Sequence, residues 1–156
     1  MRYGHYTDTP IGRLYLAEET GYLVRLDGGK ADDADILECT SLLEKAEQQL
    51  QEYFSRGRRH FTLPVHMQGT DFQKKVWQAL LQIPYGEIRA YGEIARIIGS
   101  PGGARAVGGA CNRNPIMIVV PCHRVIGAGG KLVGFGGGLG MKEALLRHEG
   151  IPIMQK

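Results

Sequence analysis

The stretch 91–113, YGEIARIIGSPGGARAVGGACNR, decides the architecture of this chain. Its apolar residues recur at three- and four-residue spacing on both sides of the glycine-containing turn 99–103. This spacing predicts two short helices, over 91–98 and 103–112. Two short helices joined by such a turn are typical of a helix-turn-helix. The sequence therefore predicts a helical domain of a kind that docks on nucleic acids.

The second predicted helix carries few side chains on the face opposite its apolar stripe. That face consists of Ala106, Gly109, Ala110 and Arg113, with Arg105 at its flank. A helix that reads base edges in the major groove projects longer polar side chains. A bare face beside two arginines instead predicts close, sequence-tolerant docking on an anionic partner, such as the minor groove of DNA. Tight packing against another helix is the structural alternative, because glycine and alanine also serve that purpose.

The patterns on either side of this motif predict two domains. Strand patterns occupy 2–6, 13–18 and 21–26, and helical patterns occupy 41–54, the region after Thr70, and the region from Met141 to His148. Residues 1–62 are therefore expected to form a small α/β domain, an antiparallel sheet with one helix. Residues 63–156 are expected to form a mainly α-helical domain that contains the helix-turn-helix and two of the three cysteines.

The charge is distributed unevenly between these two parts. Residues 1–62 hold 8 Lys and Arg against 11 Asp and Glu, a net −3, and residues 63–156 hold 11 against 5, a net +6. A basic second domain is consistent with a polyanionic partner that binds there alone. A solvated surface of mixed charge is the alternative.

The cysteine count and the hydropathy indicate in which cellular compartment the protein is expected. Three cysteines, Cys39, Cys111 and Cys122, form an odd number without a CxxC pair, which argues against a disulfide framework and a four-cysteine zinc site. No apolar stretch is long enough to cross a bilayer, and the first residues lack the apolar core that a signal peptide is expected to have. We therefore expect a cytoplasmic protein without a membrane partner. Cys111 lies on the apolar stripe of the second helix and is expected to be a small buried hydrophobe.

A candidate nucleophile follows the apolar run 116–120, within Pro121-Cys122-His123-Arg124-Val125. Proline suits the first position of a helix, where free N–H groups favour an adjacent anion. The neighbouring imidazole of His123 accepts the thiol proton directly or through a water. The pattern indicates a primed cysteine nucleophile shortly after the docking helix, and hence covalent chemistry on a nucleotide.

Five motifs, in their order and spacing, resemble the O6-alkylguanine-DNA alkyltransferase family. They are Thr9-Pro10-Ile11-Gly12, Arg105-Ala106-Val107-Gly108-Gly109-Ala110, Asn114-Pro115, Pro121-Cys122-His123-Arg124-Val125 and His148-Glu149-Gly150. The resemblance covers residues 70–150 closely and the N-terminal part more loosely. It implies direct repair of double-stranded DNA that contains O6-alkylguanine, with O4-alkylthymine as an open second substrate. The damaged base is flipped out of the duplex, and its alkyl group passes irreversibly to the protein in a single turnover.

The resemblance also implies roles for individual residues. Cys122 would accept the alkyl group, His123 would deprotonate it through a water, and Glu149 would orient His123. Tyr91 would protonate the leaving guanine, and Asn114 would hold the turn that carries Cys122. Arg105 would fill the space left by the flipped nucleotide. The base pocket would be lined by Val125, Gly134, Phe135 and Gly136.

Structural alternatives accompany several of these assignments. Tyr91 also fits an ordinary core position, Asn114 a turn residue before proline, and Glu149 an exposed helix end. Arg124 suits either a phosphate contact or a pair with a carboxylate. The sequence alone leaves the last choice open.

No metal or cofactor is expected. Some members of the family hold a zinc ion in the N-terminal domain with two cysteines and two histidines, whereas this half offers only Cys39, His5 and His60. We expect a monomer. The competing function is a non-catalytic damage-binding protein of the alkyltransferase-like type, which keeps the docking helix but lacks the cysteine, and Cys122 argues against it. A sequence-specific helix-turn-helix regulator is disfavoured by the bare helix face.

Overall fold

The computed structural model describes residues 1–130, 132 and 138–152, and it divides the chain into two compact units, Met1–Gln68 and Gly69–Lys156. The sequence patterns place the division earlier, after residue 62. The segment between these two positions joins the first unit through its backbone. Leu23 N–H donates to the Pro64 carbonyl over 2.8 Å, and His66 N–H donates to the Leu23 carbonyl over 3.0 Å.

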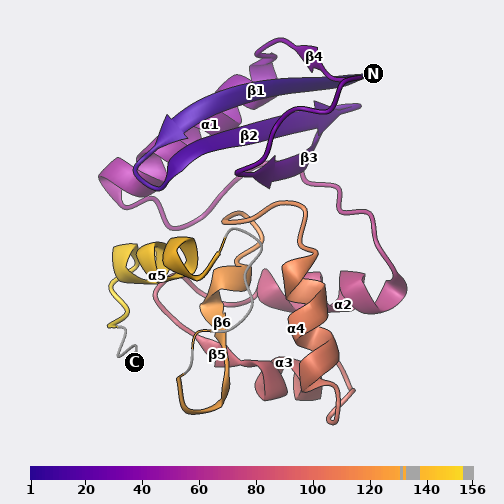
Figure 1. Cartoon of the computed structure of the whole chain (residues 1–156), viewed down its shortest axis with the longest axis vertical. Coiled ribbons are helices and arrows are strands. Elements are labelled where there is room, and N and C mark those ends of the chain that lie inside the picture. The colour runs from indigo at the N-terminus through magenta and orange to yellow at the C-terminus, as the bar shows by residue number, and fades with distance from the viewer. Residues whose placement is uncertain (131, 133–137, 153–156) are drawn as a thin grey trace. The chain divides into compact units, whose positions relative to one another are not determined.

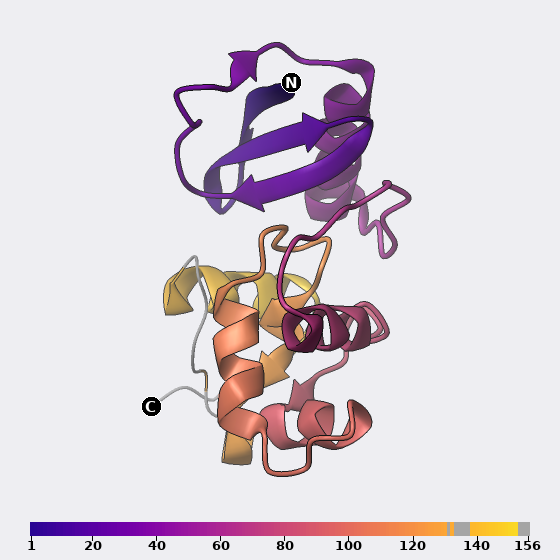
Figure 2. The ribbon, with the colours of Figure 1, turned by 90° about the vertical axis from the view of Figure 1, so that its right-hand side faces the viewer.

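The first unit is a four-stranded sheet with one helix (Figures 1 and 2). Its elements are β1 (Arg2–Thr9), β2 (Gly12–Glu19), β3 (Tyr22–Asp27), β4 (Ile36–Leu37) and α1 (Ser41–Arg56). The strand order is β3-β2-β1-β4, with β1, β2 and β3 antiparallel and β4 parallel to β1. The α/β class is confirmed, but the sheet is mixed rather than purely antiparallel. The strand β4 was not predicted because two residues are too few to show an alternation.

Local sequence explains where α1 begins and how it packs. Thr40 precedes the helix, and its hydroxyl accepts the Leu43 N–H, which satisfies one of the free donors of the first turn. Gly57 ends the helix with a positive φ of 70°, a conformation that glycine adopts without a steric penalty. The apolar stripe of α1 packs against β1, β2 and β3, and its buried apolar members are Leu43, Ala46, Leu50 and Tyr53.

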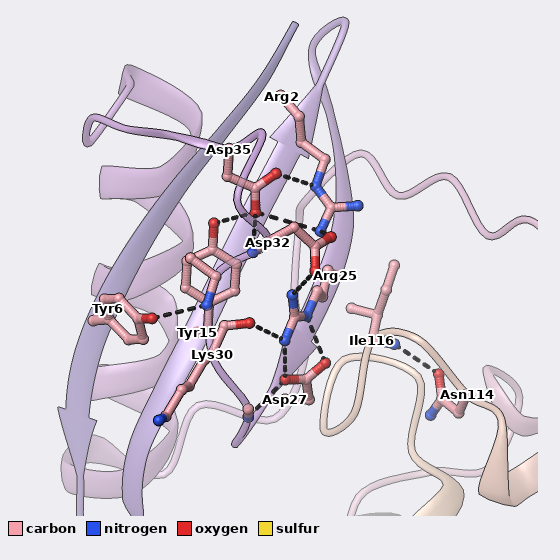
Figure 3. A network of polar contacts seen from close by, with 12 residues as sticks. Arg2, Tyr6, Tyr15, Arg25, Asp27, Lys30, Asp32, Asp35, Asn114 and Ile116 are labelled. Carbon is pink, nitrogen blue, oxygen red and sulfur yellow. Dashed lines mark hydrogen bonds and ion pairs between the residues drawn. The ribbon is translucent and has the colours of Figure 1, made fainter.

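A polar network fastens the connection after β3 to the sheet (Figure 3). The Tyr15 hydroxyl donates to the Asp35 carboxylate over 2.5 Å, and the Arg2 guanidinium forms an ion pair with the same carboxylate at 2.9 Å. Burial raises the pKa of Asp35, but the hydrogen bonds from Tyr15 and Asp32 N–H and the charge of Arg2 outweigh it, so the net pKa is lowered. Asp35 therefore remains charged at neutral pH and holds its partners in place.

The second unit is mainly helical, as predicted (Figure 1). Its elements are α2 (Asp71–Leu80), β5 (Arg89–Ala90), α3 (Tyr91–Ile97), α4 (Ala104–Asn112), η1 (Cys122–Arg124), β6 (Val125–Ile126), η2 (Ala128–Gly130) and α5 (Leu139–His148). The helices α2, α3 and α4 pack against one another, and α3 and α4 form the expected pair around the turn that contains Gly99, whose φ is 80°. Within the described ranges, none of the helices combines the length and the apolar composition needed to cross a bilayer.

Two contacts that the sequence patterns do not show fix this helical arrangement. The buried indole of Trp77 in α2 donates through Nε1 to the Ala110 carbonyl in α4 over 2.9 Å. The parallel pair β5–β6 places Arg89 opposite Val125, which joins the start of α3 to the residues after Cys122. Both contacts position the helix-turn-helix next to the segment that carries the cysteine.

The close approach of Gly4 to Tyr15 generates a test of the first unit. Gly4 on β1 pairs with Ala17 on β2, and a Cβ at Gly4 would overlap the Tyr15 hydroxyl and ring. We expect Gly4→Ala to displace Tyr15 from Asp35 and to lower the free energy of unfolding by about 1–3 kcal/mol, as measured by urea unfolding.

The matched control is the same substitution in a Tyr15→Leu chain, where the obstructing ring is absent. The cost of Gly4→Ala should fall in that background, because the two positions interact directly. An equal cost in both backgrounds would contradict the assignment.

Candidate functional site

The thiol of Cys122 is held at the start of η1, directly after Pro121, and the residue is only 2% exposed. The Asn114 side-chain amide donates to Cys122 Sγ over 3.2 Å and to the Val120 carbonyl over 2.7 Å. Its oxygen accepts the Ile116 N–H over 2.9 Å (Figure 3). Asn114 thus contacts both ends of the turn that leads to the cysteine and the sulfur itself. This geometry agrees with the predicted holding role and goes beyond a simple turn residue.

The apolar run before the cysteine forms a tight buried turn. Val120 N–H donates to the Ile116 carbonyl over 3.0 Å, and Ile118 adopts a positive φ of 73°. This conformation is unfavourable for a β-branched residue and costs on the order of 1–3 kcal/mol. Burial of Ile116, Ile118 and Val120 offsets the cost. The strain is therefore located directly before the reactive residue, where it fixes the path of the backbone.

The electrostatic environment keeps the Cys122 thiol protonated. Burial raises the pKa of Cys122 to about 11, while the Asn114 hydrogen bond and the charge of Lys142 act in the opposite direction. The sequence analysis expected a thiolate favoured by a helix N-terminus. That expectation is corrected, because η1 has three residues and its free N–H groups do not outweigh the loss of solvent. A neighbouring base must take the proton before the sulfur reacts.

A buried cluster of three charged or ionisable side chains lies next to the thiol. His123 Nε2 lies 2.7 Å from Glu149 Oε2, and Arg124 donates through Nε and Nη2 to the two Glu149 oxygens over 2.8 and 3.0 Å. Arg124 Nη1 also donates to the Ile83 carbonyl over 2.7 Å, and Gly86 N–H donates to Glu149 Oε1 over 3.2 Å. Arg124 therefore pairs with a carboxylate, which the sequence had left open. Glu149 is buried rather than an exposed helix end.

This cluster determines which nitrogen of His123 is the base. Glu149 also accepts hydrogen bonds from Arg124, so it is ionised, and His123 Nε2 must carry the hydrogen that it donates to the carboxylate. Nδ1 then holds the lone pair, and it has no hydrogen-bond partner among the described residues. Burial lowers the pKa of His123, although Glu149 opposes the shift, so the imidazole is neutral at neutral pH. The result is a basic nitrogen one residue from a protonated thiol.

A second pair of side chains, Tyr91 and Lys142, lies in the same unit. Tyr91 begins α3, and its hydroxyl oxygen accepts a hydrogen bond from Lys142 Nζ over 3.3 Å. Burial raises the pKa of the Tyr91 phenol, with smaller contributions from Cys111 and Cys122, so the hydroxyl keeps its hydrogen and acts as a donor. Burial also lowers the pKa of Lys142, whereas the neighbouring thiols Cys122 and Cys111 raise it.

Sequence analysis missed Lys142. The helical spacing could have predicted that Lys142 is buried. It precedes the apolar Leu145 and Leu146 by three and four residues and so lies on the core face of α5. A lysine on such a face is rarely buried without a partner. Cys111 is buried in α4 as expected, and burial, followed by the nearby Cys122, raises its pKa and makes it unreactive.

The exposed face of α4 retains four of its five predicted members. Arg105, Ala106, Gly109 and Arg113 are exposed, whereas Ala110 is only 3% exposed. The prediction for Ala110 was wrong because this residue follows the buried Val107 by three positions and lies on the core side of the helix.

The glycine on this face is not needed for packing within the chain. A Cβ built at Gly109 meets no atom of the described residues within 4 Å. Tight internal helix packing therefore does not explain it, and the bare surface is available to an external partner.

The predicted base pocket is described only in part. Val125 is completely buried in β6. Gly134, Phe135 and Gly136 lie outside the described residues.

Comparisons with known proteins agree with this arrangement. Residues 71–151 match the DNA binding domain of 6-O-methylguanine DNA methyltransferase, and residues 1–67 match its ribonuclease-like domain. A Methanosarcina acetivorans protein, methylated-DNA–protein-cysteine methyltransferase, is 49% identical over 148 residues, which cover 92% of this chain and 95% of that protein.

Solved structures of other proteins are also similar to this chain. Mycobacterium tuberculosis OGT in complex with DNA is similar with a TM-score of 0.88 and 48% identity, over 94% of this chain and 92% of that chain. S. pombe Atl1, in complex with damaged DNA containing O6-carboxymethylguanine, is similar with a TM-score of 0.51 and 38% identity, over 58% of this chain and 85% of that one. The two matched domains and the identity across nearly the whole length lead to one conclusion: the chain belongs to the 6-O-methylguanine DNA methyltransferase family.

Proposed function

We propose that this protein repairs double-stranded DNA by moving an alkyl group from O6 of guanine to Sγ of Cys122, once per molecule. The observation that carries the proposal is the buried thiol beside a neutral imidazole, His123, whose Nδ1 has no partner among the described residues. The name of the Methanosarcina relative describes the same reaction class, and the Mycobacterium structure contains DNA.

The first step activates the thiol. The proton leaves Cys122 Sγ and reaches His123 Nδ1 through a bridging water, because adjacent residues on a helical turn do not face each other. The imidazolium that forms is stabilised by Glu149 through Nε2. Arg124 keeps this carboxylate ionised and in place, so it supports the base without touching the substrate. Its role is therefore one of positioning.

The second step transfers the alkyl group. The thiolate attacks the alkyl carbon in line with the carbon–O6 bond, the carbon–sulfur bond forms, and the electron pair of the broken bond remains on guanine. Tyr91 donates its hydroxyl hydrogen to the departing base, and Lys142 Nζ stabilises the resulting phenolate through its existing hydrogen bond. The product thioether has no thiol proton to give and no leaving group. Each molecule therefore acts once, as a stoichiometric reagent.

The exposed face of α4 supports the DNA-docking step. Arg105 and Arg113 supply positive charge, and the bare Ala106 and Gly109 allow the helix backbone to approach the duplex closely. Flipping a base costs a few kcal/mol, and least for a poorly paired base. Arg105 would fill the space that the nucleotide leaves. These residues recognise the duplex rather than its sequence.

One chain supplies every residue that the proposed chemistry uses, which supports a monomer. The three cysteines are free in the structure, which is consistent with a reducing, cytoplasmic setting. A non-catalytic damage-binding protein is the second candidate, because the similarity to S. pombe Atl1 covers 58% of this chain. Cys122, held by Asn114 and next to a base, favours the transferase.

Mass spectrometry separates the two candidates. After incubation with duplex DNA that contains O6-methylguanine, we expect the intact protein to gain one methylene, with peptide analysis assigning it to Cys122. The Cys122→Ala chain should bind the same DNA and keep its mass. An unchanged wild-type mass together with tight binding would identify a damage-binding protein instead.

The pH dependence tests the base. In the wild-type chain the rate of alkyl transfer should fall as the pH drops through the lowered pKa of His123, because the imidazolium cannot accept the thiol proton. In His123→Ala the thiol must ionise alone with a pKa of about 11. Its rate at neutral pH should be roughly 10²–10⁴-fold lower and should rise with pH up to that value.

A free modified base serves as the substrate in these measurements, so that DNA docking does not contribute. Two parallel pH profiles, differing only in scale, would exclude His123 as the base.

The α4 face is tested at Gly109. Gly109→Gln should weaken DNA binding, because its side chain separates the helix from the duplex, while Gly109→Ala should weaken it less. Neither change meets an obstacle within the described residues, and both residues favour helix over glycine by up to about 1 kcal/mol. Thermal unfolding should therefore show equal or higher stability. A loss of stability that parallels the loss of binding would point to a packing role instead.

A further inference from the structure

A cluster of metal-ligating side chains lies in the first unit, in residues that the repair chemistry does not use. His5, Cys39 and Glu47 each offer one ligand atom, and these three atoms all lie within 4.8 Å of one another. They come from strand β1, from the residues before α1, and from α1 itself. The three residues are separated along the chain, so their proximity appears only in the folded structure.

Strand pairing brings the first two residues together. In the parallel pair of β1 and β4, Gly4 lies opposite Leu37, and Glu38 N–H donates to the Gly4 carbonyl over 3.1 Å. The chain therefore still runs beside β1 when it reaches Cys39, next to His5. Backbone pairing, rather than a contact between the two side chains, therefore brings Cys39 beside His5.

The helix supplies the third residue. Thr40 caps α1 immediately after Cys39, and Glu47 lies two turns into the helix. His5 Nε2 lies 3.1 Å from Glu47 Oε2, and both side chains are 27% exposed. Cys39 itself is exposed, so solvent reaches the cluster.

The ligand chemistry fits zinc. A thiolate, an imidazole and a carboxylate are ligands that Zn²⁺ accepts in tetrahedral geometry, with bonds of about 2.0–2.3 Å. Such bonds place neighbouring ligand atoms roughly 3.3–3.8 Å apart. The distance of 3.1 Å between His5 Nε2 and Glu47 Oε2 is already near this range, and the Cys39 sulfur lies within 4.8 Å of both atoms. The exposed side leaves a fourth position for water.

Charge and access also favour a divalent cation. The Glu47 carboxylate and a Cys39 thiolate together match the charge of the ion. A cavity of about 260 Å³, lined in part by His5 and Cys39, opens beside them. Arg13 also lines this cavity, and its guanidinium lies over the Tyr6 ring, 4.1 Å from the centroid.

We propose that His5, Cys39 and Glu47 bind one zinc ion, with water as the fourth ligand. Zinc–sulfur, zinc–nitrogen and zinc–oxygen bonds form, and the thiol proton of Cys39 is released to the solvent. This site uses a single cysteine and a glutamate and does not include His60, so it differs from a site made of two cysteines and two histidines. It revises the expectation that this half holds no metal.

The ion would fasten β1, the segment before α1 and α1 to one another. A ligand that binds only the folded state stabilises it. Zinc should therefore raise the unfolding temperature of the full chain, and should not do so when a ligand is removed.

Cobalt spectroscopy of the metal-free full chain tests the proposal. The Cys122→Ala chain is used throughout, so that the thiol of the repair site does not contribute. Titration with Co²⁺ should give one equivalent of binding with a sulfur-to-cobalt charge-transfer band, and Zn²⁺ should displace the cobalt and remove the band. Cys39→Ala in the same background should abolish the band. Cys111→Ala should retain it.

Zinc affinity provides the second measurement. Competition with a chromophoric chelator should show that His5→Gln and Glu47→Gln weaken binding roughly 100-fold or more, beyond the 10–100-fold loss typical for outer-shell partners. Thermal unfolding without metal should show that the variants are folded. A band that persists without Cys39 would show that another thiol binds the cobalt, and the absence of stoichiometric binding would show that His5 and Glu47 contact only each other; either result overturns the proposal.

The outcome is independent of the repair reaction. Cys39→Ala in an otherwise wild-type chain should transfer the alkyl group at the wild-type rate, because Cys39 belongs to the first unit and has no role in the proposed chemistry. Failure of zinc binding would leave alkyl transfer intact. Failure of alkyl transfer would leave the cobalt band intact.

Discussion

The buried carboxylate of Glu149 organises the second unit, because three separate chain segments meet at it. It accepts hydrogen bonds from His123 and Arg124 of η1 and from the backbone of Gly86. A buried charge without a partner costs several kcal/mol, so this carboxylate requires Arg124 to remain ionised. Once ionised, it holds the hydrogen of His123 on Nε2 and leaves Nδ1 as the basic atom. Folding and the orientation of the base therefore depend on the same contacts.

Burial of Cys122 has two opposite consequences for its chemistry. It raises the pKa of the thiol to about 11, which makes the resting residue unreactive toward oxidants and metals. It also places the reaction in a site of low dielectric constant, where the fixed groups around the sulfur act more strongly than they would in water. In the proposed mechanism the neutral His123 reconciles the two, because it accepts the thiol proton and so generates the thiolate. A reagent that acts once benefits from such protection.

The two sides of helix α4 have different roles: one packs in the core and the other faces outward. Val107, Ala110 and Cys111 face the core, where the Ala110 carbonyl receives the Trp77 hydrogen bond. Arg105 and Gly109 face outward. The Trp77 contact ties α4 to α2, while the β5–β6 pair ties the start of α3 to the end of η1. The surface proposed to dock on DNA and the nucleophile thus belong to one rigidly connected set of elements.

The sequence by itself determined the two-part organisation and the helix pair of the second unit, because helical spacing is a local property of the chain. Its short motifs marked Cys122 and His123, and their resemblance to the alkyltransferase family added Asn114, Tyr91 and Glu149 as candidates. Only the tertiary structure decided that Ala110 is buried, that Arg124 pairs with Glu149, and that Lys142 lies beside Tyr91. It also gathered His5, Cys39 and Glu47. Such contacts depend on strand register and on the desolvation of charges between segments distant in sequence, and neither is encoded in a local pattern.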